Sequence, residues 1–175
     1  MRPTATLWVS SVTGNTAKIA EGVRAVLDEL GWDVHDAQLG QCPADDYVIV
    51  CFWCRKSSLD PKSMRFVESC SERKVLALGT FGGFPQGKYA DLVRGNVTAL
   101  IEQGNECLGV YLCQGKVRKE RIEERAALPE SHPHHLDEWG ILRLTEGQKH
   151  PNSTDVLYAQ AFVRDYLPSP ENSRR

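Results

Sequence analysis

A segment rich in hydroxyl groups lies near the N-terminus, after a short apolar run and before an amphipathic pattern. It contains Ser10, Ser11, Thr13, Gly14, Asn15 and Thr16. A turn between a strand and a helix can bind a phosphate, because backbone N–H groups point at the ligand and the helix dipole favours its negative charge. The segment lacks Gly-Lys-Ser/Thr and Gly-x-Gly-x-x-Gly, the two common nucleotide-binding fingerprints. Its neutral donors indicate a terminal phosphate monoester; the alternative is an ordinary capped turn.

The composition predicts a single domain that binds neither nucleic acid nor membranes. The chain has 175 residues, enough for one sizeable core, and a formal net charge of −2. Such a charge supplies no basic field for nucleic acid and no polybasic membrane patch. Because the first residues lack the apolar core of a signal peptide and no apolar run could span a bilayer, we expect a cytoplasmic protein. Its six cysteines are expected to be reduced thiols.

Apolar runs alternate with helical patterns along the chain, as in a parallel sheet covered by helices on both faces. Strands are expected at 6–10, 34–39, 47–53, 74–80 and 107–113. Helices are expected at 15–30, 118–127 and 136–144, and three more are expected to begin at Pro61, to end near Ile101 and to end near Leu167. With right-handed crossovers this alternation favours a three-layer α-β-α sandwich, whose five-stranded parallel sheet has the order 2-1-3-4-5. We expect one domain over 1–167 and a disordered tail over 168–175.

Three loops meet at one edge of such a sheet, because the carboxyl ends of parallel strands converge there. The first is the hydroxyl-rich segment, and the second begins with Phe52, Trp53 and Cys54. The third is rich in glycine and aromatic residues, and its candidate binding residues are Thr80, Phe81, Gly82, Gly83, Phe84 and, inside the next helix, Tyr89. Aromatic faces and close backbone approach at glycines suit a planar ring system.

These loops resemble those of the flavodoxins, whose phosphate loop reads (S/T)-x-T-G-x-T. The segments 79–83 and 113–116 are similar to those of a short bacterial flavodoxin-like subgroup, and the resemblance covers roughly the whole ordered chain. It implies FMN as the cofactor, with the phosphate at residues 10–16 and the ring between the loops at 52–54 and 80–89.

The resemblance also implies a function in electron transfer. The chain would carry electrons between a reductase and a terminal flavin or iron–sulfur enzyme, and the subgroup suggests anaerobic bacteria and a bilirubin reductase as one such partner. The first alternative is an NAD(P)H- or quinone-dependent FMN oxidoreductase on the same fold. The second is a binding module that has lost FMN, which the intact loop hydroxyls disfavour.

Two departures from the family bear on the bound flavin. The segment 54–58 has no glycine, and because a residue with a Cβ resists positive φ, a backbone flip that stabilises one-electron-reduced flavin should be less favoured. Arg55, Lys56 and Lys88 add positive charge to the loops that should hold the ring. These cations should make the potential of the second one-electron reduction, from semiquinone to hydroquinone, less negative than is usual in the family.

Other chemistries find less support. Cys51 and Cys54 form a C-x-x-C pair, but Cys51 falls within an expected strand and not at the helix N-terminus that a redox dithiol uses. A zinc site would need a second ligand pair, for which the histidines of residues 132–135 are candidates, but Pro133 lies among them and the segment is expected to be an exposed loop. The acidic pair 45–46 precedes the third strand, which disfavours a phosphoacceptor site, and no Ser-His-Asp arrangement is recognisable. We therefore predict no metal site and no catalytic residue.

Overall fold

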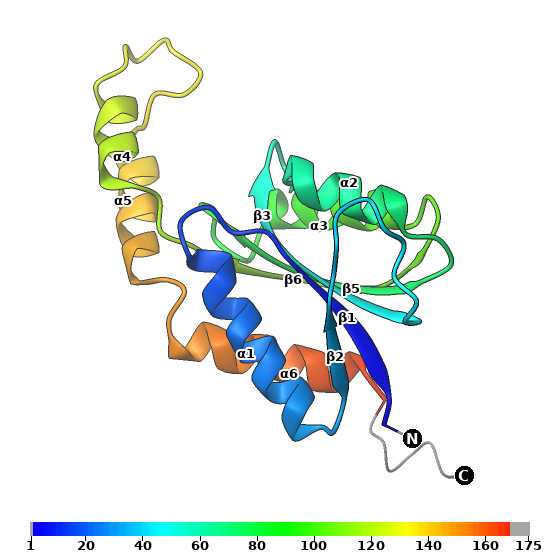
Figure 1. The fold of residues 1–175 in the computed structure, drawn as a ribbon. Helices are drawn as coiled ribbons and strands as arrows, with labels where there is room; N and C mark the ends of the chain where they lie inside the picture. The colour runs from blue at the N-terminus through cyan, green and yellow to red at the C-terminus, as the bar shows by residue number, and fades with distance from the viewer. Residues whose placement is uncertain (1, 169–175) are drawn as a thin grey trace.

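A five-stranded parallel sheet forms the middle layer of the molecule, as the computed structural model of residues 2–168 shows (Figure 1). The strands of this parallel path are Thr4–Val9 (β1), Asp33–Asp36 (β2), Tyr47–Arg55 (β3), Lys74–Phe81 (β5) and Glu106–Gln114 (β6). They pair in the order β2-β1-β3-β5-β6. Numbered along the parallel path, this is the predicted order 2-1-3-4-5, and the predicted fold class is confirmed.

A short extra strand, Ser58–Leu59 (β4), pairs with the end of β3 in an antiparallel hairpin. The turn between them consists of Lys56 and Ser57, which both have positive φ, at 49° and 58°. Two-residue hairpin turns require such angles, and Asn-Gly or Asp-Gly usually supplies them. This strand was not predicted, because Lys-Ser carries none of the usual turn signals.

Helices cover both faces of the sheet (Figure 1). One face carries Asn15–Glu29 (α1) and Ser153–Tyr166 (α6), and the other carries Pro61–Ser69 (α2) and Lys88–Ile101 (α3). Local signals fix the helix ends: Asp60 caps α2 ahead of Pro61, Asn152 and Asp155 form a capping box on α6, and Gly31 follows α1 with φ 76°.

A helical hairpin extends away from the sheet between β6 and α6 (Figure 1). It consists of Lys119–Ala126 (α4) and Glu138–Glu146 (α5), and the 3-10 helix Gly147–Lys149 (η1) follows it. We call residues 118–146 the arm. Its two helices lie against each other, and α4 has no fully buried residue.

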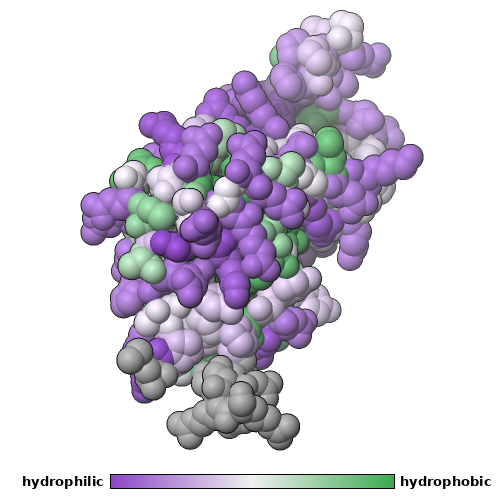
Figure 2. Space-filling view, turned by 90° about the vertical axis from the view of Figure 1, so that its right-hand side faces the viewer, coloured by the Kyte–Doolittle hydropathy of each residue, from purple (hydrophilic) through white to green (hydrophobic). Residues whose placement is uncertain are grey.

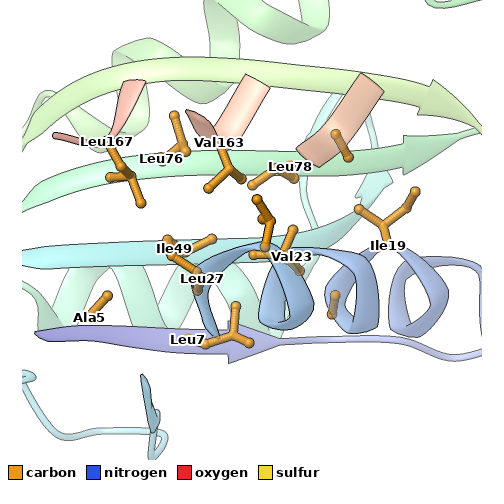
Figure 3. Close-up of a cluster of buried hydrophobic side chains, with 14 of the residues drawn as sticks. Ala5, Leu7, Ile19, Val23, Leu27, Ile49, Leu76, Leu78, Val163 and Leu167 are labelled. Atoms are coloured by element: carbon orange, nitrogen blue, oxygen red, sulfur yellow. The ribbon is translucent and has the colours of Figure 1, made fainter. Parts of the chain in front are cut away.

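Two apolar clusters fill the space between the sheet and its helices. In the first, shown in Figure 3, Ile49 and Leu76 of the sheet pack against Val23 of α1 and Val163 of α6. In the second, Val50 and neighbouring strand residues pack against α2 and α3. Because successive strand residues point to opposite faces, β3 is apolar on both sides, as the continuous apolar run predicted.

The surface is largely hydrophilic on the face shown in Figure 2, where hydrophobic residues form small separate patches. Within residues 2–168, no helix combines the length and the apolar character that crossing a bilayer requires. Apart from Pro168, the tail predicted to be disordered lies outside the described residues.

The contact between Gly79 and Phe52 should be critical for stability. A Cβ at position 79 would lie 2.8 Å from both Cε1 and Cε2 of Phe52. We expect Gly79→Ala to lower the free energy of unfolding by about 1–3 kcal/mol in urea titrations. Adding Phe52→Leu should recover part of that loss, since the smaller side chain vacates the space.

The matched control is Gly95→Ala on the exposed side of α3, where a Cβ would meet nothing within 4 Å. It should be neutral or stabilising by up to about 1 kcal/mol. Strictly additive effects of Gly79→Ala and Phe52→Leu would contradict a direct contact.

Candidate functional site

A cavity of about 390 Å³ opens at the carboxyl edge of the sheet and joins the three predicted loops. The hydroxyl-rich loop contributes Ser11, Val12, Thr13, Asn15 and Thr16; the other two contribute Trp53, Cys54, Thr80, Phe81 and Gly82. A fourth wall comes from residues beyond the end of β6, namely Gly115, Lys116, Val117, Arg118 and Arg121. The structure therefore brings most of the predicted residues around one space.

The phosphate end of this cavity is the N-terminus of α1. Gly14 precedes the helix with φ 92°, and the first turn contains no acidic side chain that would compete for its free N–H groups. The Ser11 hydroxyl accepts a hydrogen bond from Ala17 N at 3.2 Å, which closes the loop over the helix end. The Asn15 amide donates to Lys116 O at 3.0 Å and joins the loop to the segment after β6.

A buried pair of hydroxyls holds α1 against the sheet. Thr16 Oγ1 and Thr80 Oγ1 lie 2.8 Å apart, and Thr16 Oγ1 also donates to Phe52 O at 3.3 Å. Both threonines are buried, so these bonds are shielded from water. They join the ends of β3 and β5 to the beginning of the helix.

Two predicted binding residues have other contacts. Ser10 donates its hydroxyl hydrogen to Asp60 Oδ1 at 2.9 Å and does not line the cavity. Asp60 also accepts from the backbone of α2, so Ser10 joins β1 to that helix. The Phe52 side chain is fully buried in the apolar core beneath Gly79, and only its backbone carbonyl reaches towards the site.

A second, larger cavity of about 790 Å³ adjoins the first. The two share Cys54, Phe81, Gly82, Val117 and Arg121 as lining residues. The second cavity also contains the other predicted ring neighbours, Gly83, Phe84 and Tyr89, together with Lys56 and Lys88. The predicted cation Arg55 instead lines a separate cleft beside Asp60 and Pro61.

Aromatic side chains form the walls where the cavities meet. The rings of Phe81 and Tyr89 stack with centroids 6.1 Å apart and an interplanar angle of 21°. Phe84 packs on Trp139 of the arm at 5.7 Å. Gly83 leaves room for the Phe81 ring, because a Cβ at position 83 would lie 3.1 Å from Cδ2 of Phe81.

The arm contributes site residues that were not predicted. Arg121 and Arg125 come from α4, and Trp139, Arg143 and Leu144 come from α5. Arg143 donates a hydrogen bond to the Gly82 carbonyl and so joins the arm to the glycine-rich loop. The spacing of arginines at 118, 121 and 125 was the available signal, because it places them on one helical face.

The hairpin at Lys56 and Ser57 removes the basis of one expectation. We expected side chains after Cys54 to resist positive φ, yet both turn residues already have it. The paired strands β3 and β4 hold this geometry, so the missing glycine has not prevented a left-handed turn. The expectation that one-electron-reduced flavin is less favoured therefore has no support from backbone strain.

The cavity suits a phosphate ester with a flat ring. Hydroxyls and a helix N-terminus lie at one end, and Trp53 and Phe81 line the space beyond it. The backbone at Gly115 lies close to the hydroxyl-rich loop, because a Cβ on Gly115 would lie 2.8 Å from the Asn15 amide nitrogen. The donors and the shape of the first cavity are therefore compatible with FMN.

Comparison with known proteins identifies the class. The chain matches the Flavodoxin domain over residues 6–164. It therefore belongs to the flavodoxin domain family, which is a family of FMN-binding electron-transfer proteins. FMN is the cofactor that this membership supports, and redox proteins are the corresponding partners.

Individual relatives are more distant. The chain is 28% identical to the flavodoxin-like domain-containing protein BilS of Clostridioides difficile (strain CD3) over 166 residues, covering 90% of this chain and 93% of that protein. A short-chain flavodoxin associated with a bacterial microcompartment superposes with a TM-score of 0.51 at 15% identity, covering 94% of this chain and 99% of the other. Oxidised flavodoxin 2 of Bacillus cereus superposes with a TM-score of 0.50 at 17% identity, again covering 94% of this chain and 99% of the other. These superpositions show the shared fold.

Both thiols of the C-x-x-C pair have raised pKa values. Cys51 is buried within β3, and burial raises its pKa to about 12. Burial also raises the pKa of Cys54 to about 11, against the lowering effect of backbone hydrogen bonds from Ser57 and Ser58. Within residues 2–168, no cluster of three or more potential metal ligands is found.

Alkylation should distinguish these thiols. With its pKa near 11, Cys54 holds little thiolate at pH 8, so iodoacetamide should modify it roughly a hundredfold more slowly than an ordinary exposed thiol. The rate at Cys54 should keep rising up to about pH 11, as followed by mass spectrometry of the peptides. Exposed Cys42 is the internal reference. Rapid labelling of Cys54 below pH 8 would instead support an activated dithiol.

Proposed function

We propose that the chain binds FMN in the first cavity and carries electrons between a reductase and a terminal redox enzyme. The observation that supports this function is the presence of a hydroxyl-lined helix N-terminus and aromatic loop residues around one space. In this proposal the phosphate lies at residues 11–16, and the ring lies between Trp53 and the segment 80–83. Bound FMN supplies reversible one- and two-electron transfer.

The residues of the chain have separate roles in this proposal. Ser11 and Thr13 offer hydroxyl donors to the phosphate alongside the N–H groups of α1. Trp53 and Phe81 exclude water from the ring, and Gly82 and Gly83 allow backbone near its edge. Ser10 and Phe52, predicted as binding residues, support the site from outside through Asp60 and Gly79.

The second cavity favours a second candidate function, an NAD(P)H- or quinone-dependent FMN oxidoreductase. A substrate of such an enzyme must lie beside the flavin, and the arm encloses a space of about 790 Å³ next to the first cavity. Stopped-flow reduction of FMN-loaded protein by NADPH would separate the two functions. A carrier should be reduced by its partner reductase and only slowly by the nucleotide.

We also propose which kind of redox partner the chain serves. A terminal flavin or iron–sulfur enzyme would suit an FMN carrier, and a bilirubin-reducing flavin enzyme is the specific partner that the sequence resemblance suggested. Exposed apolar side chains near the cavities, Val12, Tyr89 and Trp139, offer contact area at this edge.

FMN affinity should depend on the loop hydroxyls. Titration of the apo-protein should quench flavin fluorescence with one-to-one stoichiometry, and riboflavin should bind much more weakly because it lacks the phosphate. Thr13→Val should weaken FMN roughly tenfold, since a hydrogen bond to a charged group contributes about 1.5–3 kcal/mol. It should leave riboflavin affinity unchanged.

Ser10→Ala is the matched control, because its hydroxyl contacts Asp60 instead of the cavity. This variant should lower the melting temperature while FMN affinity stays within about twofold. Equal affinities for FMN and riboflavin would contradict the phosphate site, and absence of quenching at micromolar protein would refute the proposed function.

The cations near the ring should raise the flavin potential. Lys56→Gln removes a positive charge from the wall shared with Phe81 and Gly82, so reduction of bound FMN should become harder by on the order of tens of millivolts. Redox titration at low ionic strength measures the shift. Lys74→Gln, at the opposite edge of the sheet, is the control; equal shifts in both variants would show only an effect of net charge.

A further inference from the structure

We propose that the second cavity binds a small organic anion that has at least two negative charges and a flat apolar part, held by Arg121, Arg125 and Arg143. The side chains that define this site belong to the chain itself and do not depend on FMN. Its position beside the flavin, as a substrate or effector would require, rests on the function proposed above.

The three arginines converge from two helices of the arm. Arg121 and Arg125 lie one turn apart on α4, and Arg143 comes from α5, which lies against it. All three line the second cavity. Arg143 uses one N–H on the Gly82 carbonyl, so most of its donors stay available.

The positive charges at this site have no carboxylate partner in the described part of the chain. Ion pairs among residues 2–168 involve other side chains, such as Lys119 with Glu123 on α4. The side chains that line the second cavity include Lys56 and Lys88 besides the arginines, and no aspartate or glutamate. Because the acidic residues of α4 do not line the cavity, the charged side chains around it are all positive.

Mutual repulsion marks this cluster as a site for an anion. Burial lowers the pKa of Arg125, and the charges of Arg121 and Arg143 lower it further. A bound anion would relieve that repulsion, and guanidinium groups hold carboxylate or phosphate oxygens in paired hydrogen bonds. Several converging guanidinium groups thus favour a ligand with more than one negative charge.

Aromatic side chains that line the same cavity account for the flat apolar part. Phe84 and Trp139 pack together at 5.7 Å, and Phe81 stacks with Tyr89. Trp139 nevertheless keeps 62% of its surface exposed, so a planar ligand could still cover it. A single small anion would use the arginines and leave this wall unused.

Calorimetry with naphthalene-2,6-dicarboxylate tests the proposal on the full chain. The probe should bind at micromolar to submillimolar concentration, and the neutral dicarboxamide roughly tenfold more weakly or worse. Arg121→Gln and Arg125→Gln should each weaken the probe roughly tenfold, with far-UV circular dichroism confirming the fold. Lys119→Gln, which removes a charge from the same helix outside both cavities, should stay within about twofold.

Several outcomes would overturn the proposal. They are no binding at about 1 mM probe, equal weakening by Lys119→Gln, or inorganic phosphate binding as tightly as the probe. Arginine-dependent binding of poly-glutamate without binding of the probe would instead indicate an acidic protein partner. The experiment is repeated with saturating FMN. Displacement of the probe would place it in the FMN site and overturn the proposal, whereas probe binding by a protein that fails to bind FMN would refute only the proposed function.

Discussion

The parallel pairing of β3 with β1 and β5 is the constraint on which the candidate site depends. Val9 pairs with Cys51, and Trp53 pairs with Thr80, so the three strands end at one edge in fixed register. A slip of one residue would exchange the faces of β3 and move Phe52 from one apolar cluster to the side of the other, where Cys51 packs. The hydroxyl-rich loop, Trp53 and the glycine-rich loop therefore meet only because this register holds.

Polar contacts at the edge then convert strand pairing into a shaped cavity. The bond between Thr16 and Thr80 fixes α1 over the ends of β3 and β5, and Ser10 with Asp60 fixes α2 beside β1. Each contact satisfies a buried hydroxyl and holds the start of a helix in place. The donors of α1 and the aromatic walls remain available to a ligand.

Sequence patterns predicted the sheet, the loops of the first cavity and the two helices of the arm, but not how the arm packs. Periodicity shows which elements form, and parallel strands bring their loops together, so Thr13 and Trp53 could be placed near one site. Periodicity and residue type do not show where a side chain at a strand end points, which is why Ser10 and Phe52 lie elsewhere than expected. The helices of the arm were expected as separate elements, because the charged sequence of α4 has few apolar residues to indicate where it packs.

The arm also shows why net charge was a poor guide to local charge. A chain with net charge −2 has no long-range basic field, and salt screens exposed charges beyond about 8–10 Å. Partial burial lowers the effective dielectric and weakens screening, so Arg125 and Arg143 act more strongly than exposed Arg121 on a group within a few ångströms. Such a cluster selects ligands that enter the cavity and contributes little to steering large partners from a distance. Placing it beside the aromatic wall of the first cavity gives this flavodoxin-family fold a second, chemically distinct surface at the same edge of the sheet.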